Sequence, residues 1–437
     1  MDFATLYPDH LATVLQRMYA ALERSGHDHL LIASGVLKYQ FLDDRPYPFA
    51  INPHFLQCVP LVEHTDGWIV VTPGKKPVLV YHQPADYWHL PPTEPQGFWT
   101  EHFDIRVIRS PQEAAQHLPK SGRMAILGEA DAALEGLVPN NPKAVLDELH
   151  YQRAYKTDYE LACLRMASRR AARGHIAARI AFEAGASEYE INRAYLGAAG
   201  HNDVDVPYGN IVALNEHAAV LHYQHQEHAA PAQSRSFLID AGARHNGYSS
   251  DITRTYGRDD ARFQALIDGV ESAQLALVDQ VRAGNDYRAI HLDAHLRLAT
   301  VLRDRNVVRM SPEAQVETGV SSVFFPHGVG HLLGLQVHDV AGFAGSIHGD
   351  LISKPDGHPF LRLTRPLAAG MVVTIEPGLY FIPMLLQGLQ DGPHAGDINW
   401  AEVEHLSRFG GIRIEDDVAC RTQGAPENLT RDAFAAI

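Results

Sequence analysis

Two carboxylates at the ends of short apolar segments constrain the fold of this chain more than any other feature. Phe237 to Ile239 form an apolar segment that reads as a buried strand ending on Asp240, and Gly242 is the turn signal after it. Asp251 follows eleven residues after Asp240, in a second strand predicted over residues 249–256. A carboxylate in an apolar strand is costly to bury unless it is paired or binds a metal ion. We therefore expect both acids to face a common partner from adjacent strands of one hairpin.

Three further segments carry a residue that can bind a metal. A glycine-bracketed loop at 326–331 delivers His331, and a strand-like segment at 371–378 contains Glu376 just before a Pro-Gly stop. Residues 411–416 alternate strictly, which puts Arg413 and Glu415 on one face of a strand. Four carboxylates and one imidazole make a mostly oxygen ligand set that suits manganese, cobalt or zinc. Two divalent ions would balance the four negative charges, with a bridging hydroxide as the nucleophile.

The length of 437 residues predicts two domains, an N-terminal α/β domain over 1–156 and a second domain over 157–437. Thr157 and Glu160 form a capping box at this boundary, which predicts a long helix from there to about residue 183. Ala184-Gly185 and Ala283-Gly284 each precede a helix-like segment, which indicates two similar units in the second domain. In the first domain, the patterns predict a helix over 8–24, a strand over 29–34 and a hairpin over 68–81.

Composition excludes several classes of protein. The net charge of −15, without a basic stripe, argues against a nucleic-acid partner. Three scattered cysteines suggest no disulfide framework and favour a reducing compartment. We find no signal-peptide pattern at the N-terminus and no apolar run long enough for a membrane span, so a cytoplasmic protein without a membrane partner is expected.

The motifs around these ligands resemble those of the metal-dependent pita-bread peptidases, and within them the bacterial Xaa-Pro dipeptidases (prolidases), a group that includes organophosphorus acid anhydrolases. The resemblance is carried in order by residues 238–242, 251–255, 325–331, 336–339, 374–378 and 411–416, and it extends to residues 41–49 in the N-terminal half. It implies an α/β (α+β) protein: a C-terminal pita-bread fold with a pseudo-twofold repeat, preceded by a smaller α/β domain. It also implies hydrolysis of Xaa-Pro dipeptides with two divalent ions, most simply Mn²⁺, with Co²⁺ or Zn²⁺ as alternatives.

The resemblance assigns roles position by position. The metal ligands would be Asp240, Asp251, His331, Glu376 and Glu415. Asp251 and Glu415 would bridge both ions, and Glu376 would also handle the proton of the attacking water. The residues that orient the substrate and stabilise the intermediate would be His222 and His338, with Arg413 supporting the network.

The same resemblance assigns substrate contacts. Arg362 would pair with the terminal carboxylate of the substrate, for which a guanidinium fork is suited. The side-chain pockets would be lined by Tyr208, Leu221 and Val337. The loop that carries Asp44 would reach the active site of a second subunit, so a homodimer is expected.

Neighbouring residues leave some assignments open on the residues alone: Arg362 or Arg365, Asp44 or Asp43, and His222 or His225. His327 is interpreted as structural. Thr253 and Thr374 are expected to hydrogen-bond to the ligands rather than bind metal.

Four functions compete. The first is an Xaa-Pro dipeptidase with a side activity on organophosphorus esters. The others are an aminopeptidase of the same fold (for Xaa-Pro or methionine), a principal organophosphorus acid anhydrolase, and a binding protein without catalysis. All five ligand positions are present, which argues against the last.

Overall fold

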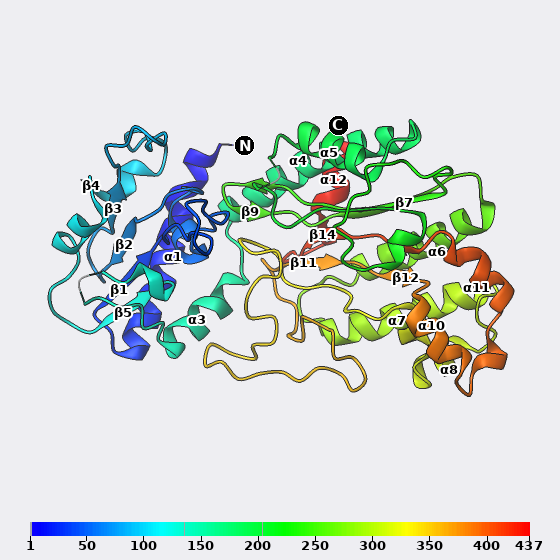
Figure 1. Cartoon of the computed structure of the whole chain (residues 1–437). Coiled ribbons are helices and arrows are strands. Elements are labelled where there is room, and N and C mark those ends of the chain that lie inside the picture. The colour runs from blue at the N-terminus through cyan, green and yellow to red at the C-terminus, as the bar shows by residue number, and fades with distance from the viewer. Residues whose placement is uncertain (1, 135, 203) are drawn as a thin grey trace. The chain divides into compact units, whose positions relative to one another are not determined.

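The computed structural model describes residues 2–134, 136–202 and 204–437, and the chain divides into two compact units (Figure 1). Unit 1 comprises Met1–Cys163, Asn246–Tyr248 and Gly345–Asp350. Unit 2 comprises Leu164–His245, Ser249–Ala344 and Leu351–Ile437. The candidate metal ligands all belong to unit 2.

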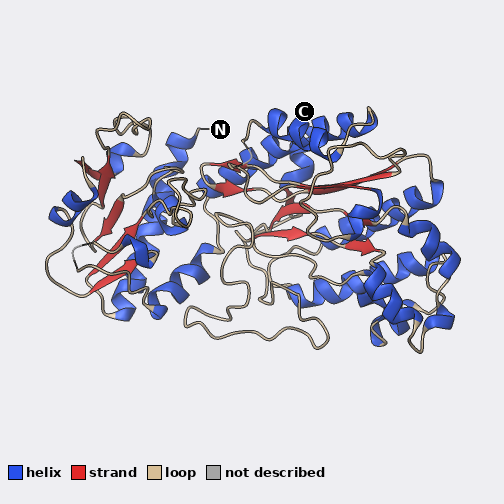
Figure 2. Ribbon diagram, in the orientation of Figure 1, coloured by secondary structure: helices blue, strands red, loops and turns tan. Residues whose placement is uncertain are grey.

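A five-stranded mixed sheet forms the centre of unit 1, in the order β4-β3-β2-β1-β5 (Figure 2). Its strands are β1 (His29–Ala33), β2 (Trp68–Val71), β3 (Val78–His82), β4 (Asp104–Ile108) and β5 (Met124–Leu127). The predicted strand at 29–34 and the predicted hairpin are confirmed, because β2 and β3 pair antiparallel. The helices are α1 (Phe3–Ser25), α2 (Pro53–Cys58) and α3 (Lys143–Arg153). Helix α1 begins at Phe3 rather than at the predicted Pro8, because the Asp2 side chain caps it by accepting from the Ala4 N–H.

Helix α4 (Asp158–Glu183) begins where the capping box predicts. The Thr157 N–H donates to Glu160 over 2.8 Å, and the Glu160 N–H donates to Thr157 Oγ1 over 3.4 Å. The other helices of unit 2 are α5 (Glu188–Ala199), α6 (Ala261–Val278), α7 (Tyr287–Asp304), α8 (Pro312–Glu317), α9 (Val320–Phe324), α10 (Pro383–Gln390), α11 (Trp400–Ser407) and α12 (Leu429–Ala435). Across the described ranges, no helix combines the length and hydrophobicity needed to cross a membrane.

The strands that follow α5 form small sheets in the orders β10-β7-β6, β11-β14-β15, β12-β13 and β8-β9. They are β6 (Ile211–Leu214), β7 (Ser236–Asp240), β8 (Arg244–His245), β9 (Tyr248–Ser249), β10 (Thr253–Gly257), β11 (Val372–Ile375), β12 (Gly378–Tyr380), β13 (Gly411–Arg413), β14 (Asp416–Ala419) and β15 (Glu427–Asn428). In Figure 1, α4, α5 and α12 lie above these strands and α7 lies below them. Buried side chains of α4, α5, β6 and β7, including Phe182, Tyr195 and Phe237, form one apolar core.

The predicted repeat within unit 2 is visible in this arrangement. Gly185 and Gly284 both adopt positive φ, 84° and 94°, which glycine tolerates best, and α5 and α7 follow them. One three-stranded sheet lies between α5 and α6 in the sequence, and strands of the second follow α7. Unit 2 is thus built from two helix pairs, α4 with α5 and α6 with α7, each associated with a small sheet.

The predicted hairpin is present, but its second strand is shorter than predicted. Strands β7 and β10 pair antiparallel with Asp240 opposite Thr253, so Asp251 lies before β10 and outside the ladder. The reason is that the backbone N–H groups of Ser250 and Asp251 bind acceptors outside the β7–β10 ladder. The Ser250 N–H donates to the Ala243 carbonyl over 2.9 Å, and the Asp251 N–H donates to the Asp417 carboxylate over 3.2 Å.

Gly242 makes room for the segment before Asp251 that leaves the β7–β10 ladder. A Cβ added at Gly242 would lie 2.0 Å from the Ser250 carbonyl oxygen, so a side chain there would displace the segment that leads into Asp251.

Replacing Gly242 with alanine is therefore expected to destabilise unit 2 by about 1–3 kcal/mol, the usual cost of overpacking. Gly197→Ala is the matched control, because Gly197 lies within α5 and nothing approaches its Cβ position within 4 Å. That change should leave stability unaltered or raise it by up to about 1 kcal/mol. Urea unfolding of both variants measures the difference, and equal midpoints would contradict the close approach.

Candidate metal centre

The five candidate ligands converge where the small sheets of unit 2 meet. Asp240 ends β7, Glu376 directly follows β11, and Glu415 lies between β13 and β14. The main chain joins these sheets, since the Glu415 N–H donates to the Thr253 carbonyl over 3.1 Å. His331 arrives from the loop after α9, whose backbone pairs with β11 at Leu332.

Four of the five ligands lie within direct reach of one another. Asp251, His331 and Glu415 each offer a ligand atom within 4.8 Å of the others. His331 Nε2 is 3.3 Å from Asp251 and 3.5 Å from Glu376. Asp240 joins the group through Tyr208, whose hydroxyl is shared between Asp240, at 2.7 Å, and Asp251.

Hydrogen bonding fixes the orientation of the imidazole. His331 Nδ1 lies 2.9 Å from the Leu332 carbonyl, which can only accept, so Nδ1 carries the proton. Nε2 therefore faces the carboxylates, where Asp251 and Glu376 outweigh burial and raise the pKa of the imidazole, so a metal ion at Nε2 would take the place of a proton.

Two threonines and one arginine hold the carboxylates in place. Thr253 Oγ1 donates to Glu415 over 2.6 Å, and Thr374 Oγ1 lies 3.3 Å from Glu376, which confirms the predicted hydrogen bonds. The Arg413 guanidinium donates to Asp240 over 2.7 Å, and its charge also opposes the rise in the pKa of Glu415, beside which it was expected. The arginine is buried, so it supplies a fixed positive charge at the edge of the cluster.

Burial of these carboxylates makes their ionised forms unfavourable, and this effect changes their pKa values. Burial and the charges of the neighbouring acids raise the pKa of Glu415 well above its usual range. Burial also raises the pKa of Asp240, despite Arg413, and raises the pKa of Glu376 to about 7. At Asp251 burial acts in the same direction, but the adjacent His331 outweighs it and lowers the pKa. The donor set thus fits divalent cations, which would offset the repulsion and let all four acids ionise.

The residues expected to contact the substrate lie in different surroundings. The ring of His338 packs edge-on against His331, with centroids 4.3 Å apart. Burial, followed by the charges of His331 and Arg362, lowers the pKa of His338 to about 4, which places Arg362 within electrostatic reach. His222 is exposed and acts on the pKa of the same imidazole. Leu221 and Val337 are partly buried.

The structure separates the two arginines that the sequence left open. Arg362 is exposed, whereas Arg365 is 2% exposed and its guanidinium contacts the Ala341 carbonyl. Only Arg362 is accessible to a small anion. Asp44 lies in unit 1, exposed, as does Asp43 beside it.

One functional group was not predicted from the sequence. Tyr380 accepts from Arg413 over 2.9 Å and lies 2.8 Å from His327 Nε2, which extends the buried network to the loop before His331. Alternation along the segment from Glu376 through Gly378 puts Tyr380 on the same face as Glu376, and this pattern could have identified it.

A buried set of four acids and one imidazole, held by strand ends in an α/β unit, defines a protein that binds divalent cations. Comparisons with known proteins agree. Residues 162–422 match metallopeptidase family M24, and residues 5–151 match the Xaa-Pro dipeptidase N-terminal domain. The chain therefore belongs to metallopeptidase family M24.

Relatives match along the whole chain. An Xaa-Pro dipeptidase of Xanthomonas campestris pv. campestris is 57% identical over 437 residues, which is 100% of this chain and 99% of the relative. An Xaa-Pro dipeptidase of Stenotrophomonas maltophilia is 54% identical, over 100% and 98%. Among solved structures, Pseudomonas aeruginosa aminopeptidase PepP superimposes with a TM-score of 0.72 at 22% identity and 98% coverage of both chains. Escherichia coli aminopeptidase P with the inhibitor Pro-Leu gives 0.71 at 22%, also with 98% coverage of both. These structures share the pita-bread fold.

Removal of metal is expected to make stability depend on pH in a defined direction. The folded-state pKa of Glu376, about 7, exceeds the unfolded value of about 4.5, so its contribution is fully present below about pH 4.5 and is lost as pH rises through about 7. After chelation, the free energy of unfolding should fall by on the order of 2 kcal/mol between about pH 5 and pH 8. Urea unfolding at each pH measures it.

Glu376→Gln should make this dependence shallower, because the amide does not titrate, while Asp240 and Glu415, whose pKa values are also raised, keep part of it. Glu404→Gln, at an exposed position of α11, should not change it. Stability that rises with pH over this interval in the chelated protein would contradict the electrostatic account.

Proposed function

We propose that this chain is an Xaa-Pro dipeptidase that uses two divalent metal ions, with Mn²⁺ as the working metal. The observation that carries the proposal is the buried ligand set Asp240, Asp251, His331, Glu376 and Glu415 in a chain similar to Xaa-Pro dipeptidases over its full length. The aminopeptidase P structures share only about a fifth of its residues, so they support the fold and not the substrate.

In this proposal the five ligands would hold both ions, with Asp251 and Glu415 as the residues that would serve both. When bound, the ions supply a hydroxide nucleophile at neutral pH and polarise the scissile carbonyl. The bond before proline is a tertiary amide, and its nitrogen, like that of any amide, must gain a proton to leave as an amine. Glu376 is suited to move that proton, because its side chain is 17% exposed against 13% for Asp240 and 8% for Asp251.

The substrate is a zwitterionic dipeptide, and the exposed residues beside the cage supply its recognition. Arg362 receives the terminal carboxylate in a bidentate pair, and His338 and His222 orient the peptide group. Tyr208, Leu221 and Val337 line the side-chain pockets. Arg413 holds the Asp240 carboxylate in position through its hydrogen bond.

The test of this function is turnover of a short peptide panel by the manganese-loaded protein. Ala-Pro and Leu-Pro should be cleaved, and Gly-Pro-Gly should remain intact because its proline lacks a free carboxylate. Asp251→Asn should reduce turnover to background, since it removes a ligand shared by both ions. Asp304→Asn, at an exposed position at the end of α7, is the matched control and should retain activity. Rapid release of glycine from Gly-Pro-Gly would favour the aminopeptidase function instead.

Carboxylate recognition by Arg362 gives a separate prediction. Arg362→Gln should lower kcat/KM for Leu-Pro roughly 10–100-fold, mainly through KM, because a charge-assisted bond contributes about 1.5–3 kcal/mol. Leu-prolinamide lacks the carboxylate, so its kcat/KM should not change in this variant. Arg303→Gln, another exposed arginine, serves as the protein control. Equal losses on both substrates would contradict the assignment.

We also propose a cytoplasmic homodimer. The loop around Asp44 exposes large apolar side chains, Phe41 at 89% and Leu42 at 91%, which a second subunit would cover. Cys58, Cys163 and Cys420 are free and buried, as suits a reducing compartment. Equilibrium sedimentation that gives the mass of one chain would reject the dimer.

A side activity on organophosphorus esters is the last part of the proposal. A phosphotriester has a tetrahedral centre similar to the intermediate of amide hydrolysis, so the same site can act on it. A kcat/KM on a phosphofluoridate above that on Leu-Pro would make this the principal activity.

A further inference from the structure

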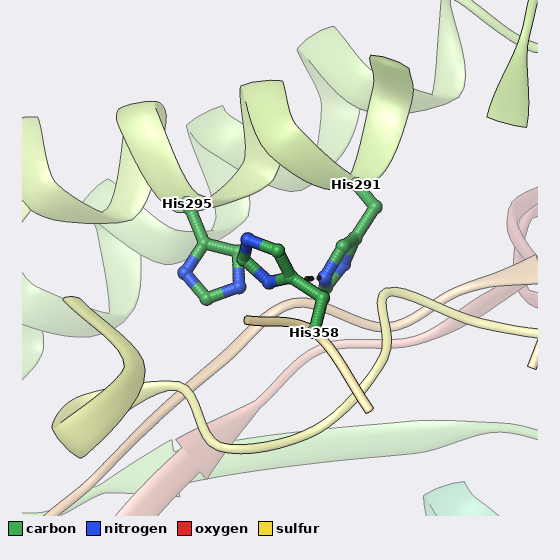
Figure 3. Close-up of side chains that lie close together, drawn as sticks. All are labelled: His291, His295 and His358. Atoms are coloured by element: carbon green, nitrogen blue, oxygen red, sulfur yellow. Dashed lines mark hydrogen bonds between the residues drawn. The ribbon is translucent and has the colours of Figure 1, made fainter. Parts of the chain in front are cut away.

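Three histidines meet in unit 2 away from the candidate ligand cage. His291 and His295 stand four residues apart on one face of α7, and His358 reaches them from the loop between Lys354 and Leu361 (Figure 3). One ring nitrogen of each lies within 4.8 Å of the others. The three ring centroids are 4.8, 4.7 and 4.6 Å apart.

These spacings suit three imidazoles around one ion. With metal–nitrogen bonds of about 2.0–2.1 Å, each ring centroid lies roughly 3.2 Å from the ion, so tetrahedral ligands have centroids roughly 5 Å apart. The observed centroid distances are within a few tenths of an ångström of that value.

The hydrogen bonds leave nitrogens for such an ion. His295 Nδ1 is 3.0 Å from Ser321 Oγ, which orients the ring and leaves Nε2 as the nitrogen available to a ligand. His291 Nε2 and His358 Nδ1 lie 3.0 Å apart, so one donates to the other. His291 is 1% exposed, and its Nδ1 is buried without a hydrogen-bond partner among the described residues.

The three rings are also in the protonation state that a metal requires. Burial, together with the neighbouring imidazoles, lowers the pKa of His291 to about 2 and that of His295 to about 3. Burial lowers the pKa of His358 as well. All three are therefore neutral around pH 7, so a metal would not have to displace protons from imidazolium ions.

We propose that His291, His295 and His358 form a second metal site, separate from the carboxylate cage, which binds one Zn²⁺ or a similar borderline ion. An all-imidazole donor set favours zinc over the harder cations that the oxygen-rich cage suits. His358 is only partly buried, so the ion would enter from its side, and a water would complete the four ligands.

The position of the site indicates what it does. The loop that carries His358 continues directly to Arg362, and its backbone packs on the turn before His331: a Cβ at Gly328 would lie 2.9 Å from Leu361 Cα. The Phe325 ring contacts both His295 and His327, each with a centroid distance of 4.8 Å. An ion held by the three histidines would therefore hold this loop against α7. It would also restrict the position of Arg362, which follows in the same loop.

The experiment is zinc binding by the full chain. Metal-free protein is dialysed against low-micromolar Zn²⁺, and bound zinc per chain is measured by mass spectrometry. Wild type and His348→Ala, which removes an exposed histidine outside the cluster, should retain one zinc more per chain than His358→Ala or His295→Ala. Because the comparison is a difference between variants, it holds whatever the carboxylate cage binds, and it does not depend on the proposed peptidase function.

The position of the ion is tested by anomalous diffraction at the zinc edge from the wild-type crystal. A peak about 2.0–2.1 Å from one nitrogen of each ring is expected. Equal zinc content in wild type and both cluster variants, or no peak between the rings, would overturn the proposal. His295→Ala loses an internal side chain and can unfold, so His358→Ala, on a partly buried loop position, decides the binding comparison.

Discussion

Repulsion between buried carboxylates is the constraint on which the rest of unit 2 depends. Asp240, Asp251, Glu376 and Glu415 lie together with little access to water, and the Arg413 guanidinium and the His331 imidazole lie against them as counter-charges. Neutral hydroxyls of Tyr208 and Thr253 satisfy other oxygen atoms without cancelling charge. Four carboxylates stay this close together only when a rigid backbone or bound cations hold them in place. Here that backbone, the frame of the site, consists of short strands that end at the cluster.

The frame is assembled from both halves of unit 2. Asp240 and Asp251 precede α6 in the chain, and the other three ligands follow α7. The halves are joined at Thr253 and Glu415, which share a main-chain and a side-chain hydrogen bond, and at Asp251, whose N–H donates to the Asp417 carboxylate over 3.2 Å. Neither half holds a complete ligand set, so the site exists only when both have folded and docked.

The sequence predicted the parts of this centre that follow from local rules. Asp240 and Glu376 lie where apolar strands end, Thr157 caps α4 as its spacing from Glu160 indicates, and β2 and β3 form the expected hairpin. Asp251 was placed wrongly inside a strand, because its backbone is held by Asp417, a residue 166 positions away. A contact between residues so far apart in the chain leaves no periodic pattern in the amino-acid sequence.

Long-range contacts also explain why the histidine cluster and the role of Tyr380 were not predicted from the sequence. His291 and His295 have helical spacing that is visible in the sequence, but the third histidine comes from a loop without periodicity. Tyr380 lies beyond the strand predicted at 371–378, and its role depends on His327 and Arg413, which arrive from other segments. The choice between Arg362 and Arg365 likewise needed burial, which the similar sequence surroundings of the two arginines did not reveal.

The buried chain of hydrogen bonds that begins at Arg413 has a fixed direction. A guanidinium can only donate, so the Tyr380 oxygen accepts from it and the Tyr380 proton points to His327 Nε2. The remaining proton of that imidazole then lies on Nδ1, 2.8 Å from the Gly328 carbonyl. Reversing the first bond would require a neutral arginine, and reversing the second would set an unprotonated His327 Nδ1 against the Gly328 carbonyl oxygen. The wall of the site behind Asp240 is thus polarised in one sense only, from the Arg413 guanidinium to the Gly328 carbonyl.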